Sequence, residues 1–225
     1  MLNPNKELWA ISPVDGRYAT ATSDLAAYFS EAALIKYRLK VEVEYLVALN
    51  DCKIGALASV DAEKVKELRS LYLSFNEQDA ERIKDTEKIT NHDVKALEYF
   101  IKEKLIGTSL ESIVEFVHFG LTSQDINNTA FPLSIKDAVA EIYLPYLNRI
   151  IEALKLRSEE WKDIPMLSRT HGQPASPTRL GKEIMVFVER LSSQQEFLET
   201  IPFCAKFGGA TGNFNAHVVA FPEIN

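Results

Sequence analysis

Apolar residues recur every three or four positions along most of this chain, which is the spacing of one face of an α-helix. One such stripe follows Ser30, a second follows Asp61, and a third follows the segment Thr90–Asn91. Serine, threonine, asparagine and aspartate are favoured helix N-caps, so each of these positions predicts a helix start. No proline occurs between Pro13 and Pro132, which is typical of a helical region.

The longest apolar stripe runs from Ser123 to about Trp161 and predicts a single helix of roughly forty residues. Pro132 and Pro145 lie inside the stripe and should kink the helix rather than end it, because the periodicity resumes after each. Such a helix would be about 60 Å long, whereas a compact monomer of this size is about 35–45 Å across. We therefore expect the helix to overhang its own subunit and to pack on other copies.

A further helix is expected from Pro177 to about Thr200, with Ser176 as its N-cap. Proline suits the first helical position, since no amide donor is needed there. No segment shows a convincing alternation of apolar and polar residues, so no strand is predicted. These patterns together predict an all-α fold.

The 225 residues carry a net charge of −7, and 46% of them are hydrophobic. This composition suits a folded chain with a substantial core. The acidic balance argues against general binding to nucleic acids or membrane surfaces, although a local cationic pocket could still bind a small anion. The polar N-terminus does not resemble a secretion signal, and no apolar run is long enough to span a membrane. Cys52 and Cys204 lack metal-site spacing, so we expect two buried free thiols in a cytoplasmic protein.

The densest candidate chemistry lies in Ser168–Glu183, which contains His171 flanked by Arg169 and Arg179. Gly172 and Pro174 argue against regular structure around the histidine. We therefore expect His171 on a short loop that leads into a helix N-terminus, where backbone amides favour anions. An ordinary surface histidine is the alternative interpretation.

Three other polar clusters could bind an anionic ligand. The turn at Arg17–Tyr18 presents a guanidinium beside a phenol, which could clamp a phosphate and cover a base. Asn91–Asp93 offers a donor, a titratable ring and an acceptor at one helix start, and Thr122–Gln124 offers two hydroxyls and an amide at another. Ordinary surface turns and helix caps are the alternatives. His118 lies on an apolar stripe and is interpreted as a packed core residue.

A glycine-rich loop with amide side chains is predicted at Phe207–His217. It lacks the spacing of a phosphate-binding P-loop, so that interpretation is excluded.

Five segments resemble, in order and at plausible spacing, the purine-nucleotide branch of the fumarase/aspartase superfamily. They are Ser12–Tyr18, Thr90–Ala96, Thr122–Asn128, Arg169–Glu183 and Gly209–His217. Gly172 points to this branch, because a leucine usually occupies that position in the sister enzymes. The resemblance implies an all-α homotetramer with no metal or organic cofactor. It further implies an N-terminal helical domain at 1–111, followed at 112–225 by the start of a central domain whose long helices form the bundle core of four subunits.

The reaction implied by this resemblance is a β-elimination that releases fumarate from adenylosuccinate, giving AMP, and from SAICAR, giving AICAR. By the same resemblance His171 is the general acid that protonates the departing nitrogen, a task to which imidazole is suited near neutral pH. The small nucleotide substrate would be bound in sites shared between subunits by Arg17, Tyr18, Asn91, His92, Asp93, Thr122, Ser123, Gln124, Thr170 and Gln173.

The resemblance places the family's mobile serine-rich loop, which carries the catalytic base, downstream of residue 225, together with a C-terminal domain. We therefore expect an N-terminal fragment that is inactive alone. One alternative is another fumarate-releasing lyase such as argininosuccinate lyase, against which Gly172 and the Arg17–Tyr18 turn argue. The other is a non-catalytic helical assembly protein, which gives no reason for polar clusters at three successive helix starts.

Overall fold

The computed structural model describes residues 8–223, which are mostly helical and include one two-stranded sheet. The described chain divides into two compact units, one formed by residues 8–136 with 204–223 and the other by residues 137–203. The predicted all-α class is confirmed. The domain boundary expected near residue 111 falls inside the first unit, and the domain division of the whole protein stays a prediction.

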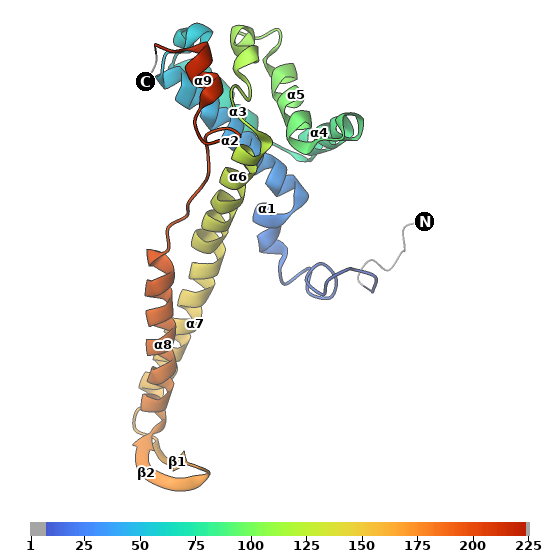
Figure 1. The fold of residues 1–225 in the computed structure, drawn as a ribbon. Helices are drawn as coiled ribbons and strands as arrows, with labels where there is room; N and C mark the ends of the chain where they lie inside the picture. The colour runs from blue at the N-terminus through green and yellow to red at the C-terminus, as the bar shows by residue number, and fades with distance from the viewer. Residues whose placement is uncertain (1–7, 224–225) are drawn as a thin grey trace. The chain divides into compact units, whose positions relative to one another are not determined.

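The first unit is built around α2, which contacts α3, α4 and α5 (Figure 1). Its core is a cluster of buried aliphatic side chains from these helices, including Leu39, Leu46, Leu68 and Leu97. The helices are α1 (Ala26–Phe29), α2 (Glu31–Asp51), α3 (Ala62–Leu73), α4 (Glu77–Thr90), α5 (Asp93–Leu105), most of α6 (Ser123–Ala138) and α9 (Asn215–Ala220). Short 3₁₀ turns lie at Ser23–Leu25, Gly55–Ser59 and Glu111–Phe116.

Two of the three predicted helix caps are confirmed. The Ser30 hydroxyl accepts the Ala33 amide at 3.1 Å and begins α2, and the Asp61 carboxylate accepts the Lys64 amide at 3.0 Å and begins α3. The prediction that Thr90 or Asn91 caps α5 is wrong, because His92 itself is the N-cap. Asn91 instead ends α4 in the left-handed conformation, with φ +52°, which asparagine tolerates better than most residues.

Residues 123–160 are helical throughout, as predicted, although not uniformly α-helical. A π-helical turn at Val139–Tyr143 separates α6 from α7 (Leu144–Glu160). Pro132 lies inside α6, and Pro145 lies in the first turn of α7 directly after the π-turn. Proline has no backbone N–H, so Pro145 cannot donate the regular α-helical hydrogen bond to the preceding turn. The π-helical turn lies at this position, where the α-helical hydrogen-bond pattern is already interrupted.

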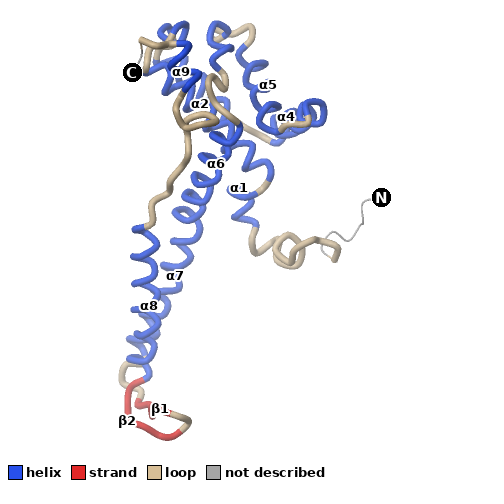
Figure 2. The backbone as a smooth tube through the Cα atoms, in the orientation of Figure 1, coloured by secondary structure: helices blue, strands red, loops and turns tan. Residues whose placement is uncertain are grey.

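In the second unit, α7 packs beside α8 (Leu180–Thr200), and a β-hairpin connects them (Figure 2). Strand β1 (Pro165–Thr170) pairs antiparallel with β2 (Gln173–Arg179). The predictions of no strand and of a helix start at Pro177 are therefore wrong. Pro174 and Pro177 both lie in β2, which is possible because a two-stranded sheet consists only of edge strands, where proline is tolerated.

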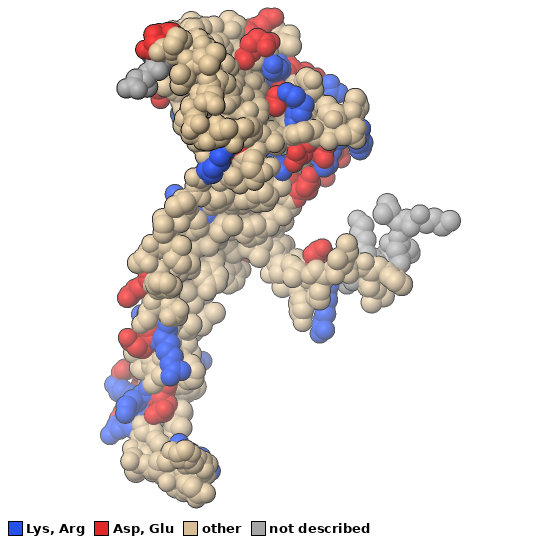
Figure 3. Space-filling model, in the orientation of Figure 1, with Lys and Arg blue, Asp and Glu red and all other residues tan. Residues whose placement is uncertain are grey.

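Gly181 allows the start of α8 to approach the end of α7. A Cβ atom on this glycine would lie 2.2 Å from the Ser158 carbonyl oxygen and 2.7 Å from the Lys162 Cα. The Ser158 hydroxyl donates to the Gly181 carbonyl at 2.7 Å and is itself buried. Acidic and basic side chains are interspersed along the visible face of this helix pair (Figure 3). On α7, Lys155 and Glu152 form an ion pair at 2.9 Å.

Candidate functional site

The start of α5 carries the candidate cluster Asn91–Asp93. The His92 Nδ1 accepts the Lys95 amide at 3.2 Å, so this nitrogen serves as the helix cap. Asp93 accepts the Val94 amide at 2.8 Å and lies 3.5 Å from the His92 ring. About half of the His92 side chain is exposed, and its contacts with Lys95 and Asp93 both involve Nδ1.

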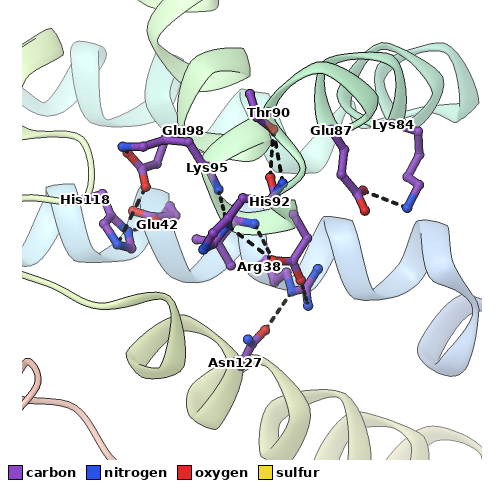
Figure 4. A network of polar contacts seen from close by, with 12 residues as sticks. Arg38, Glu42, Lys84, Glu87, Thr90, His92, Lys95, Glu98, His118 and Asn127 are labelled. Carbon is purple, nitrogen blue, oxygen red and sulfur yellow. Dashed lines mark hydrogen bonds and ion pairs between the residues drawn. The ribbon is translucent and has the colours of Figure 1, made fainter.

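A buried arginine that sequence reasoning missed joins this cluster to the start of α6 (Figure 4). Arg38 on α2 lies 2.6 Å from the Asp93 carboxylate, and its Nε donates to the Asn127 side-chain oxygen at 2.8 Å. Burial alone would raise the pKa of Asp93, but the Val94 amide and the Arg38 guanidinium lower it below its usual range. Arg38 thus links the cluster Asn91–Asp93 to Asn127 in the second turn of α6, a few residues after the cluster Thr122–Gln124.

At the start of α6, the three candidate side chains differ in which of their hydrogen-bonding groups are already paired within the protein. Thr122 donates both its amide and its hydroxyl to Asp125, at 2.8 and 3.0 Å. Gln124 donates its amide group to Asn128 at 2.7 Å. The Ser123 hydroxyl has no hydrogen-bond partner among the described residues and is only partly buried.

Beside these helix starts lies a buried ionic network in which His118 is central. Its Nδ1 is 2.6 Å from the fully buried Glu42 carboxylate, and its Nε2 is 3.7 Å from Glu98, which pairs with Lys95 at 2.6 Å. Burial lowers the pKa of His118, but the Glu42 carboxylate raises it more, so the net shift is upward. The His118 side chain is only 12% exposed, as expected of a packed residue, but it lies in a turn at φ +60° rather than on an apolar helix, and its ring contacts two carboxylates.

The sequence contained one signal for this network. Arg38 and Glu42 are four residues apart within a helix whose neighbouring positions, such as Leu39 and Val43, are fully buried. Charged groups are rarely buried without partners. Other charged residues of the same helix are not buried, such as Lys36, Lys40 and Glu44. The sequence therefore signals charges on a largely apolar helix, but it does not show which of them are buried or with which partners.

The turn at Arg17–Tyr18 is exposed, and the Arg17 guanidinium lies 5.3 Å from the centre of the Tyr18 ring. The Tyr18 amide donates to the Pro13 carbonyl at 2.8 Å, which closes the turn. Within residues 8–223, no hydrogen bond or ion pair joins this pair to the other candidate clusters.

His171 lies at the tip of the hairpin. The prediction that it lies on a short loop leading into a helix N-terminus is therefore wrong. Thr170 pairs with Gln173, and the two residues between them have φ +50° and +76°. Positive φ at both central positions is characteristic of the type I′ turn of tight hairpins. His171, Thr170 and Gln173 are all exposed and belong to the second unit, whereas the other candidates belong to the first. An Xaa-Gly pair between two short runs was the available signal for this turn.

Cys52 and Cys204 are free and exposed, so the prediction of buried thiols is wrong. No cluster of three or more His, Cys, Asp and Glu side chains suited to a metal ion occurs within residues 8–223. None of the described helices is long and apolar enough to cross a bilayer.

Comparison with known proteins identifies the family. A profile described as lyase matches residues 16–224. The chain belongs to this lyase family. It is 55% identical to the adenylosuccinate lyase of Dictyostelium discoideum and 44% identical to that of Escherichia coli (strain K12), in each case over 97% of this chain and 48% of the relative. The chain therefore spans about half the length of the curated relatives it matches.

Solved structures show the same fold at lower identity. The fumarate lyase of Mesorhizobium sp. BNC1 aligns with a TM-score of 0.67 at 23% identity, over 86% of this chain and 44% of that protein. The 3-carboxy-cis,cis-muconate lactonizing enzyme of Pseudomonas putida aligns with a TM-score of 0.67 at 19% identity, over 95% of this chain and 45% of that protein. The lyase membership predicted from the five sequence segments is confirmed.

Proposed function

We propose that the protein containing this chain is a C–N lyase that releases fumarate from adenylosuccinate, giving AMP, and from SAICAR, giving AICAR. Identity of 44% or more to adenylosuccinate lyases supports this substrate class. The structural observation that carries the proposal is the Arg38 bridge between the starts of α5 and α6. It joins Asp93, the neighbour of the His92 cap, to Asn127 of α6. The polar side chains at these two helix starts would suit a substrate with several anionic groups.

In this proposal His171 is the general acid. Elimination breaks the bond between the purine nitrogen and the succinyl carbon, while a base removes the proton from the adjacent carbon and the fumarate double bond forms. The departing nitrogen then takes a proton from the protonated His171 ring, which is left as the neutral imidazole. The tight turn limits the backbone freedom of this residue, and its exposure leaves the ring accessible. The base is expected outside these 225 residues, and the inactivity of the chain alone stays a prediction.

The other candidate residues are proposed to bind the substrate. Arg17 and Tyr18 would contact the phosphate and the base of the nucleotide, because a guanidinium and a phenol lie side by side there. The α5 and α6 starts would bind the succinyl carboxylates. Thr170 and Gln173 flank His171 at the hairpin tip and would orient the substrate near the acid.

We also propose a cytoplasmic homotetramer whose active sites are shared between subunits. The helices α7 and α8 expose large apolar side chains that a single subunit leaves uncovered, among them Leu156, Phe187 and Phe197. Exposed apolar surface of this kind marks an interface with another chain. Other copies of the same helices would cover it, as the family resemblance implies.

Ligand-dependent unfolding of the 225-residue chain tests the function. AMP, fumarate and adenylosuccinate should each raise the melting temperature, because a ligand that binds only the folded state stabilises it. Argininosuccinate should not, and a response to it alone would favour the sister lyase. A non-catalytic assembly protein would respond to none of these compounds.

A further inference from the structure

The predicted glycine-rich loop ends before α9, which begins at Asn215, and its part Phe207–Asn213 is bound to the start of α6 by one buried carboxylate. Asp125 accepts the Gly208 and Gly209 amides, each at 3.1 Å, and the Lys206 ammonium at 2.7 Å. The same carboxylate accepts the Thr122 amide and hydroxyl. Asp125 and Lys206 are 81 positions apart in the sequence. Two distant segments of the chain therefore meet at a single side chain.

The backbone of the loop is adapted to this carboxylate. Gly209 has φ +75°, and a Cβ on it would lie 3.3 Å from the Gly120 carbonyl oxygen. A Cβ on Gly208 would lie 3.2 Å from the Cα of Gly212. Only glycine permits this conformation and this closeness without strain. Lys206 also donates to the Gly209 carbonyl, which closes the loop around the carboxylate.

The carboxylate is fully buried and fully hydrogen-bonded. Burial would raise the pKa of Asp125, but the Lys206 ammonium and the surrounding amides lower it to about 2. The group is therefore ionised throughout the neutral range, and charge-assisted bonds of this kind are stronger than neutral ones.

We infer that Asp125 is a positioning residue for the proposed binding site at the start of α6. It takes both donors of Thr122 and holds Lys206 and the glycine-rich loop beside that residue. Thr122 can then meet a ligand only as a hydrogen-bond acceptor, and the Ser123 hydroxyl is the donor left for an anionic group. This inference rests on the proposed function, which it refines: Ser123, rather than Thr122, binds the substrate carboxylate.

Amide NMR of the 225-residue chain tests the structural part without any ligand. In Asp125→Asn the signals of Thr122, Gly208 and Gly209 should move together, because all three amides lose a charged acceptor. Lys206→Met keeps the carboxylate and should move the same three signals if the first variant fails to fold. Lys104→Met is the matched control, since Lys104 pairs with Asp79 at 3.0 Å and is equally exposed, at 45% against 44%. Signals that move independently would overturn the assignment.

Titration with adenylosuccinate tests the positioning role. Ser123→Ala should weaken binding about tenfold, as expected for one charge-assisted bond. In the Asp125→Asn background, Ser123→Ala should cost much less, because the carboxylate no longer fixes Thr122, the residue that precedes Ser123. Equal losses in both backgrounds would reduce Asp125 to a purely structural role and overturn the inference. No binding by the unaltered chain would count against the proposed function, while the NMR result still decides the Asp125 contacts.

Discussion

Asp125 is the residue whose contacts depend most on ionisation. Its pKa of about 2 lies below the ordinary value of 3.8, so its contribution to folding is fully present above about pH 4 and is lost as the pH falls through 2. In Asp125→Asn, the free energy of unfolding should therefore fall by about 2 kcal/mol less on acidification than in the unaltered chain. Urea unfolding followed by circular dichroism between pH 5 and pH 2 measures this.

His171 is the residue to which the proposed chemistry assigns the largest kinetic effect. In a full-length lyase that carries this chain, His171→Ala should lower the rate of fumarate release by about 10²–10⁴-fold, the usual contribution of a positioned acid. Affinity for adenylosuccinate should change far less, because the ring acts mainly in the transition state. A steady-state fumarate assay gives both constants, and an unchanged kcat would show that another group is the acid.

At the scale of elements, His92 at the start of α5 is assigned two roles, one for each ring nitrogen. Nδ1 of His92 caps the helix, whereas Nε2 is proposed to bind the ligand. His92→Asn should keep the stability of the chain, since asparagine is a good N-cap, but should weaken adenylosuccinate binding. His92→Gln should lose about 0.5–2 kcal/mol of stability, the usual value of a cap. If both variants unfold alike, the ring does not act as the cap.

The α7–α8 pair depends on one close contact. Gly181→Ala places a methyl group against the Ser158 carbonyl, and such overpacking costs about 1–3 kcal/mol. Hydrogen exchange should increase at the facing ends of the two helices. Ser193→Ala on the exposed side of α8 is the control and should leave exchange and melting temperature nearly unchanged. A Gly181→Ala chain as stable as the control would mean that the helices separate without cost.

At the scale of the whole molecule, the proposal of shared sites predicts complementation between subunits. His92→Ala and His171→Ala full-length lyases should each be nearly inactive. After dissociation, mixing and reassembly, some sites should receive both native histidines and recover part of the fumarate release. Mass spectrometry of differently tagged chains establishes that subunits have exchanged. Mixed oligomers without recovered activity would show that both histidines of a site come from the same chain.

Features with local causes could be read from the sequence. Ser30 and Asp61 cap their helices through amides three residues away, and the helical stretch at 123–160 follows from a continuous apolar period. The lyase family could be recognised because its motifs are short runs of consecutive residues. In each case the deciding interactions lie within a few positions along the chain.

Features whose partners lie far along the chain were decided only by the tertiary structure. Arg38 meets Asn127 across 89 positions, His118 meets Glu42 across 76, and Asp125 meets Lys206 across 81. No local pattern specifies such pairs, because a buried charge requires a partner without determining which one. The same holds for the hairpin around His171. Its prolines argued against a strand, and they are tolerated because no further strand among residues 8–223 pairs with either edge of the hairpin.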